Sequence, residues 1–358
     1  MKILKLVSII TATVGAFGLH SGATANTGTA YSWGRHSGPT PTAVSGIDGS
    51  ITQVITNDKN TFVLNSAGTV YQVFGTSVSA VNFPSSEPIA FLADPGPAGT
   101  EIAVGKNGEA YGWGKNSDGQ LCLPPGKISE PQVLPVTGPF TSVSGQGDHT
   151  LFAQKDSNLW ACGGNGYGDL GNGSTAASYS PVEVTGFATN QIVEVTTGWR
   201  NSGALLSNGE FWDWGFNRYG QLGDGTKTAS YVPVQVPGSY VQVFVGGAFS
   251  DNGSVLATTS SGQVFGWGDD HYGQLCDGST RPEKRPELIT GVPAASMAIA
   301  GGTDGFILST SGELYSCGQN VDGDLGTGGT SNEPTPTPVL SNVTSVDATS
   351  SISAALVS

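Results

Sequence analysis

The stretch FWDWGFNRYGQLGDG, residues 211–225, decides the fold of this 358-residue chain. An apolar, aromatic run ends at Trp214-Gly215 and is typical of a buried β-strand. A polar loop follows, and its glycines together with Asp224 have the composition of tight turns. Six other places in the chain carry the same order of residues in altered form. The stretch is therefore one copy of an internal repeat.

The residue before the strand-ending glycine locates each copy of the repeat. Successive copies are 39 to 53 residues apart, which is the period of a propeller blade and is longer than a leucine-rich or ankyrin repeat. The unit around Phe74 has lost the Asn and Gly-Gln-Leu elements, so it is the least regular copy. The seven positions are Trp33, Phe74, Trp113, Cys162, Trp214, Trp267 and Cys317.

The best-preserved units predict four strands each. Residues 241–245 and 254–258 have the apolar content of two inner strands, and a tight turn at Ser261-Gly262 leads into a third strand at 263–267. Residues 282–288 contain proline, which cannot donate a hydrogen bond to a neighbouring strand. They therefore predict an outer edge strand.

The two ends of the chain each supply part of a unit. Residues 343–358 predict the first two strands of a blade, and residues 26–34 predict a third. Joined, they make one more blade and leave no open edge between the two halves. The chain is thus predicted to be an all-β, seven-bladed β-propeller over residues 26–358, closed by pairing C-terminal strands with an N-terminal strand. An open solenoid is the alternative, but it would need atypical capping repeats at its ends.

Residues 1–25 predict a secretory signal peptide. Lys2 and Lys5 precede a mostly apolar segment at 6–19, and Ala23-Thr24-Ala25 is typical of a cleavage site. A buried strand or a membrane anchor is the alternative. The apolar segment is too short and too rich in small polar residues to span a bilayer comfortably. We therefore expect a protein secreted to the extracellular space or the periplasm, without a membrane span.

Composition and motifs exclude several classes of function. The formal net charge is −14 and there is no basic cluster, which disfavours binding to nucleic acid. The sequence contains no P-loop, nucleophile elbow, HExxH motif or EF-hand loop. We therefore expect a protein that is not an enzyme and that needs no cofactor and no metal.

The four cysteines occupy two kinds of repeat position. Cys122 and Cys276 each end a Gly-Gln-Leu-Cys segment, whereas Cys162 and Cys317 replace the Trp of Trp-Gly one unit later. Equivalent positions in adjacent units predict the disulfides Cys122–Cys162 and Cys276–Cys317. A zinc site is the alternative, but no two cysteines have the close spacing that such sites use.

The pattern Trp-Gly-x-Asn-x-x-Gly-Gln-Leu-Gly resembles the RCC1 repeat (regulator of chromosome condensation). Residues 214–223 match it fully, 113–121 and 267–275 nearly, and 163–171 and 318–326 more loosely. The resemblance implies a seven-bladed propeller. Nuclear members of that family are exchange factors for a small GTPase, whereas secreted bacterial members include a β-lactamase inhibitory protein that binds its enzyme through one face. The predicted export makes this chain similar to the secreted branch.

One face of the predicted propeller is the candidate partner-binding site. If neighbouring strands are antiparallel, the turn between the first and second strands lies at the same end of the blade as the loop after Trp-Gly. Aromatic and arginine side chains in these loops are the types that anchor protein interfaces. The predicted contact residues are Asp148, His149, Trp199, Arg200, Phe216, Arg218, Tyr219, Phe249, His271 and Tyr272.

We expect a monomer that uses this face to bind a protein. In its most specific form the expected function is inhibition of an extracellular enzyme such as a β-lactamase. A polysaccharide or cell-surface ligand is the alternative, because aromatic rings also stack on sugars.

Overall fold

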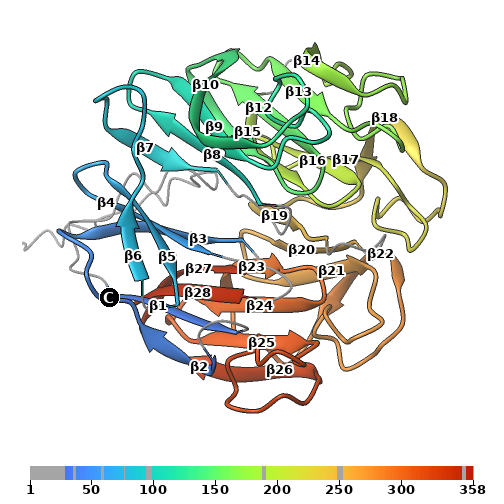
Figure 1. The fold of residues 1–358 in the computed structure, drawn as a ribbon. Coiled ribbons are helices and arrows are strands. Elements are labelled where there is room, and N and C mark those ends of the chain that lie inside the picture. The colour runs from blue at the N-terminus through green and yellow to red at the C-terminus, as the bar shows by residue number, and fades with distance from the viewer. Residues whose placement is uncertain are drawn as a thin grey trace, which may run out of the picture.

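The computed structural model describes residues 29–34, 38–57, 60–75, 77–93, 99–187, 191–247, 253–348 and 352–357. The predicted signal peptide and Phe249 lie outside these residues. All regular secondary structure in the described part is β, in seven four-stranded antiparallel sheets. The sheets follow one another around a ring, and each is one blade (Figure 1). The predicted seven-bladed β-propeller is confirmed.

The blades are numbered I to VII in the order of their first strands. Blade I contains β3 (Ile51–Thr56), β4 (Thr61–Asn65), β5 (Val70–Phe74) and β6 (Ser77–Ala80). Blade II contains β7 (Ile89–Leu92), β8 (Thr100–Gly105), β9 (Glu109–Gly114) and β10 (Ile128–Thr137). Blade III contains β11 (Phe140–Ser144), β12 (His149–Gln154), β13 (Leu159–Gly163) and β14 (Ser178–Glu183).

The remaining blades repeat this plan. Blade IV contains β15 (Ile192–Thr197), β16 (Asn201–Leu206), β17 (Phe211–Gly215) and β18 (Ser230–Val236). Blade V contains β19 (Gln242–Val245), β20 (Ser254–Thr258), β21 (Val264–Gly268) and β22 (Glu283–Ile289). Blade VI contains β23 (Ala295–Ala300), β24 (Asp304–Ser309), β25 (Leu314–Gly318) and β26 (Glu333–Leu340). Blade VII contains β27 (Val343–Ala348), β28 (Ile352–Val357), β1 (Thr29–Gly34) and β2 (Gly38–Ala43).

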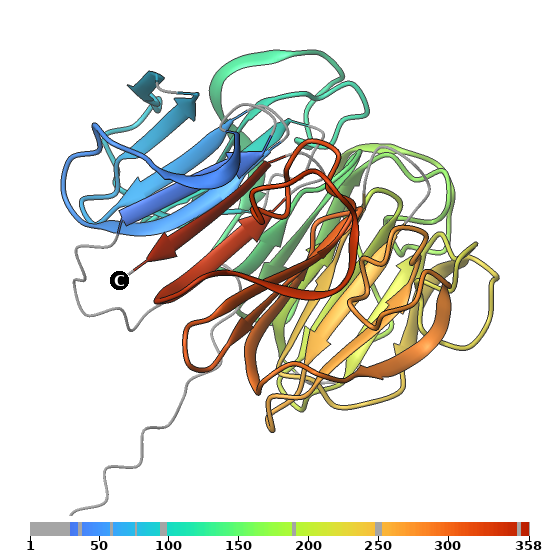
Figure 2. The same ribbon diagram turned by 90° about the horizontal axis from the view of Figure 1, so that it is seen from below.

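Blade VII closes the ring with both ends of the chain. β1 pairs with β28 in an unbroken antiparallel register, with Tyr31 opposite Ala355 and Gly34 opposite Ile352. Figure 2 shows the red C-terminal strands beside the blue N-terminal ones. The predicted closure is confirmed. The N-terminal segment also supplies β2, a proline-containing outer strand that the sequence-based prediction did not include.

Burial follows the order of strands within a blade. All six residues of the second strand β16 are buried, whereas the outer strand β18 is mostly exposed or half-buried. The outer strands β14, β18 and β22 each contain a proline, at Pro181, Pro233 and Pro286. In Figure 1 the first strands β3, β19 and β23 lie toward the middle of the ring, and β2, β18 and β26 lie at its periphery. Each blade therefore has two buried sheet faces near the axis and a polar outer edge.

Buried hydroxyl groups join the first strands of neighbouring blades. Ser144 Oγ accepts a hydrogen bond from the backbone nitrogen of Thr197 at 3.0 Å. Thr196 Oγ1 in turn accepts one from the backbone nitrogen of Val245 at 2.9 Å. Blades III, IV and V are thus connected by side-chain to main-chain hydrogen bonds. This explains why polar residues occupy buried positions in these strands.

A tryptophan and a glycine form a joint between neighbouring blades. Trp214 Nε1 donates to the carbonyl oxygen of Asp169 at 2.9 Å, and Trp267 Nε1 donates to that of Gln221 at 3.0 Å. The ring lies directly on the glycine of the Gln-Leu-Gly turn. A Cβ added to Gly223 would lie 2.9 Å from Trp267 Nε1, and the φ of Gly223 is 63°. Only glycine fits both the contact and the left-handed backbone.

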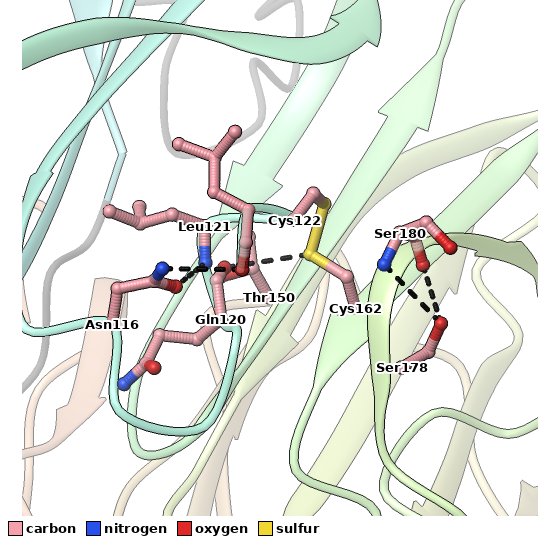
Figure 3. Close-up of a disulfide and its surroundings, with 9 residues drawn as sticks. Asn116, Gln120, Leu121, Cys122, Thr150, Cys162, Ser178 and Ser180 are labelled. Carbon is pink, nitrogen blue, oxygen red and sulfur yellow. Dashed lines mark hydrogen bonds between the residues drawn. A yellow bond between two sulfur atoms is a disulfide. The ribbon is translucent and has the colours of Figure 1, made fainter. Parts of the chain in front are cut away.

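Two joints use a disulfide in place of the Gly–Trp contact. Cys122 is bonded to Cys162 and Cys276 to Cys317, so both predicted pairs are present. Cys122 and Cys276 have φ values of 55° and 63°, the same left-handed backbone as Gly223 in the equivalent turn. Figure 3 shows Thr150 Oγ1 donating to the carbonyl of Gln120 beside the disulfide, at 2.7 Å. The two cysteines thus occupy the places of the glycine and the tryptophan.

Blade I departs from the repeat. The strand register places Val73, which is 5% exposed, where the other blades have a buried Trp or Cys. Phe74 lies at the position of the strand-ending glycine and is 54% exposed, so the predicted repeat position was one residue too far along the chain. Its outer strand β6 has only four residues. Phe83, which follows β6, packs edge-on against Tyr111 and Trp113 of blade II at centroid distances of 5.4 and 5.6 Å. An aromatic contact therefore replaces the missing joint between blades I and II.

Candidate recognition face

The first-to-second-strand turns and the loops after the third strands meet on one face, here called the recognition face. Trp199, in the turn between β15 and β16, lies between the corresponding turns of blades III and V. A Cβ added to Gly147 would lie 2.6 Å from the carbonyl oxygen of Trp199, and one added to Gly247 would lie 2.3 Å from its nitrogen. The loops thus come together as the antiparallel topology predicts.

Lys115 and Trp199 form the first cation–aromatic pair on this face. Lys115 follows the third strand of blade II, and its Nζ lies 5.6 Å from the centroid of the Trp199 ring. The same ammonium is 3.5 Å from Asp118 Oδ2. The sequence-based prediction did not include Lys115, although its position directly after Trp113-Gly114 places it in a recognition-face loop.

Arg200 and Tyr167 form the second pair, across the boundary between blades III and IV. Arg200 Nη1 donates a 3.0 Å hydrogen bond to the Tyr167 hydroxyl, and its guanidinium carbon lies 4.8 Å from the centroid of that ring. The Tyr167 ring packs edge-on against Phe216 with centroids 4.8 Å apart. The three side chains hold one another in fixed positions.

Arg218, Tyr219 and His271 form the third group, across the boundary between blades IV and V. The guanidinium carbon of Arg218 lies 5.8 Å from the centroid of Tyr219, whose ring packs edge-on against His271 at 5.2 Å. His271 Nδ1 contacts Asp269 Oδ1. Arg218 and His271 are exposed, and Tyr219 and Tyr272 are half-buried. These side chains are accessible to a partner.

Two predicted contact residues lie below the surface. His149 is 0% exposed because it is the first residue of β12, opposite Gly163, and points toward blade IV. Phe216 is 9% exposed and supports Tyr167 from below. Expecting a surface role for them was wrong: position in a loop sequence does not reveal which side chains the next blade covers.

Asp148, His149 and Ser202 form a chain that resembles a catalytic triad but is built as a structural contact. His149 Nδ1 is 3.4 Å from Asp148 Oδ1, and Nε2 is 2.6 Å from Ser202 Oγ. The Ser202 hydroxyl donates to the carbonyl oxygen of Asp169 at 2.7 Å and is fully buried. A nucleophile needs access to its substrate. The chain therefore joins blade III to blade IV.

Charge is distributed unevenly around Asp148. Burial alone would raise the pKa of Asp148, but its contact with His149 and the positive charges of Lys115 and Arg200 together hold that pKa below its ordinary value. Burial raises the pKa of Asp169, on the other side of His149, to about 6. Asp148 is thus a stable partner for the cations of the recognition face.

Trp199, Arg200 and Phe216 line a small hollow on the recognition face. The described residues contain no group of three His, Cys, Asp or Glu side chains placed to hold a metal ion, and no helix long and apolar enough to cross a membrane.

Comparison with known proteins gives the family. The model for the regulator of chromosome condensation (RCC1) repeat matches residues 107–153, 156–205, 208–250, 261–306 and 311–356. The chain belongs to this family. The matched segments cover most of blades II to VII, and blade I is outside them.

Relatives and solved structures agree with this assignment. The chain is 29% identical over 244 residues to the human E3 ubiquitin-protein ligase HERC2 and 31% identical over 201 residues to the ultraviolet-B receptor UVR8 of Arabidopsis thaliana. These matches span 64% and 54% of this chain, but only 5% of HERC2 and 44% of UVR8. Human WBSCR16 superposes with a TM-score of 0.82 at 20% identity, covering 93% of this chain and 99% of that one. Prp20p of Saccharomyces cerevisiae gives 0.78 at 16% identity, covering 92% and 91%. WBSCR16 and Prp20p thus have the same fold as this chain.

Proposed function

We propose that this RCC1-repeat propeller is a non-catalytic module that binds a protein through the recognition face of blades III to V. The observation that carries the proposal is Trp199. Its equivalents in blades III and VI are Gly147 and Gly302, so the blade itself does not need a large ring there. A half-exposed Trp beside Arg200 is the kind of side-chain pair that anchors protein interfaces.

Preorganisation of the face supports binding. Each of Lys115, Arg200 and Arg218 lies against an aromatic ring, so the rings are held before a partner arrives. Ordering such side chains only on binding would cost affinity. The shallow hollow at Trp199 favours a broad partner surface over a small ligand.

The relatives support a protein as the class of ligand. Prp20p of yeast is described as binding Gsp1p and histones, and as a ligand of Kap60. We propose only that this chain also binds a protein. Gsp1p, histones and Kap60 are partners of Prp20p. A polysaccharide is the second candidate, because the half-exposed rings of Trp199, Tyr219 and Tyr272 could stack on sugars.

We also propose that the protein is secreted and acts outside the cytoplasm as a monomer. Residues 1–25 have the features of a signal peptide, and disulfides such as Cys122–Cys162 persist in oxidising compartments. The chain's own strands close the ring, so a second copy is not needed to complete it. In its most specific form, the proposal is that the protein inhibits an extracellular enzyme such as a β-lactamase.

Capture of a partner tests the proposal. The full chain is immobilised and exposed to extracellular or periplasmic extract of the source cells, in parallel with a Trp199→Ala, Arg200→Ala variant. Tyr315→Ala, which removes a half-buried ring whose hydroxyl donates to Glu313 at the hairpin end of blade VI, is the matched control. We expect a protein that the wild type and the control retain and the double variant loses. Retention by all three would contradict the assigned face, and retention of a polysaccharide would favour the second candidate.

A further inference from the structure

A separate pocket of about 340 Å³ lies between blades IV and V, on the side opposite the recognition face. Its walls come from the connection between β18 and β19, the hairpin between β20 and β21, and the outer strand β22. The volume is at the lower end of the range for small-molecule sites.

The floor of the pocket is rigid and apolar. Tyr240 is buried, its hydroxyl donates to the carbonyl of Pro237 at 2.6 Å, and its ring packs edge-on against Phe265 with centroids 6.3 Å apart. Pro237 and Pro286 form the adjoining walls. Proline has no backbone N–H, and the Tyr240 hydroxyl is already bonded. The floor therefore offers ring faces and aliphatic surface.

The polar rim differs from the other blades in charge. Arg285 faces the turn glycine Gly225, and at three equivalent contacts the outer-strand residue is Val232, Thr335 or Thr40. The residue after the hairpin turn is Glu109, Glu210 or Glu313 in blades II, IV and VI, and it is uncharged in blades I, III and V, as Thr69, Asn158 and Gln263. Blade V thus has a cation where three other outer strands have an uncharged residue, and it lacks the carboxylate that blades II, IV and VI carry beside the hairpin.

Both polar groups have donors to offer. Among the described residues, no carboxylate lies within ion-pair distance of the Arg285 guanidinium. Gln263 Oε1 accepts from the Ser261 hydroxyl at 3.1 Å, which leaves the Nε2 amide group available. The nearby acids Glu283 and Glu287 do not line the pocket. A guanidinium and an amide N–H beside an apolar floor match a carboxylate attached to an apolar body.

We propose that the pocket between blades IV and V binds a small carboxylate with an apolar ring or branched chain, the carboxylate on Arg285 and Gln263 and the apolar part on Tyr240 and Phe265. This site is independent of the recognition face. Neither its floor nor its rim shares a residue with that face.

Ligand-observed NMR titration of the full chain tests the site with three probes. Phenylacetate has both the ring and the charge, phenylacetamide lacks the charge, and acetate lacks the ring. Arg285→Gln removes the cation, and Gln263→Glu introduces the carboxylate that blades II, IV and VI carry at this position. Arg281→Gln, an exposed residue that does not line the pocket, is the matched control.

We expect saturable binding of phenylacetate by the wild type and by Arg281→Gln. Arg285→Gln and Gln263→Glu should each weaken it by about tenfold or more, as should either incomplete probe. All the variants change exposed side chains, so folding is preserved. Equal binding of phenylacetate and phenylacetamide, an unchanged affinity in Arg285→Gln, or no binding of phenylacetate at all would overturn the proposal.

Discussion

The indole nitrogen of Trp267 donates a 3.0 Å hydrogen bond to the carbonyl oxygen of Gln221 in the preceding blade, and its ring covers the Cα of Gly223. The same joint occurs between Gly171 and Trp214 and between Gly326 and Trp33. Between blades II and III and between blades V and VI, cysteines replace both the glycine and the tryptophan. They form the disulfides Cys122–Cys162 and Cys276–Cys317. The glycine and the tryptophan thus behave as one exchangeable unit.

Exchanging the whole unit should preserve the blade junction. The double change Cys122→Gly, Cys162→Trp replaces a disulfide with the Gly–Trp joint. Cys162→Trp alone places a ring against the Cβ of Cys122, and Cys122→Gly alone leaves an unpaired thiol. We expect each single variant to lose roughly 2–4 kcal/mol in the free energy of unfolding and the double variant to lose less. Chemical denaturation measures this, and a double variant no more stable than the worse single variant would contradict exchangeability.

Gly223→Ala should be more destabilising than backbone strain alone explains. The added Cβ would lie 2.9 Å from Trp267 Nε1 and from Val236 Cγ1. Gly291→Ala is the matched control, since its φ is also positive, 81°, but nothing lies within 4 Å of the added Cβ. We expect about 1 kcal/mol of destabilisation at Gly291 and roughly 2–4 kcal/mol at Gly223. Similar losses at the two sites would show that the Trp267 ring moves without cost.

Asp270 introduces a pH dependence into blade V. It occupies the motif position of Asn217, whose Oδ1 accepts from Leu222 N and whose Nδ2 donates to Thr228 O. Asp270 Oδ1 accepts from Leu275 N in the same way, but Oδ2 is buried without a partner. Burial raises the pKa of Asp270 to about 7. A carboxylate cannot donate as the amide of asparagine does.

The sign of this effect follows from linkage. The folded pKa lies above the unfolded value, so Asp270 lowers stability progressively as pH rises from about 4 to 7, and the loss persists above pH 7. Asp270→Asn should therefore stabilise the protein at pH 8 by roughly 1–2 kcal/mol and change it little at pH 4. Denaturation midpoints of both proteins at the two pH values measure the difference. Curves that run parallel from pH 4 to pH 8 would contradict a titrating Asp270.

Much of the fold was predictable because it repeats. The spacing of the Trp-Gly positions predicted seven blades, and the repeat positions of Cys122 and Cys162 predicted their pairing. Closure of the ring was visible in two incomplete ends. β2 was missed because its prolines obscure a strand pattern, although the outer strands of blades II to VI also contain proline.

The candidate site was less predictable, because contacts between blades depend on how neighbouring sheets pack. Topology placed Trp199, Arg200 and Tyr219 on one face. It could not show that Lys115, 84 positions earlier, lies over Trp199, or that β12 turns His149 toward Ser202. Trp199, which stands where the equivalent turns of blades III and VI have glycine, was the signal that the sequence offered.

Hydrogen exchange of the chain alone and with its captured partner tests the central claim, recognition through one face, most directly. We predict slower exchange on complex formation in the turns at 145–149 and 198–201 and in the loops at 164–169 and 216–220. The hairpins at 155–158 and 207–210, at the opposite ends of the same blades, should be unchanged. Protection confined to those hairpins, or spread evenly over the ring, would contradict the claim.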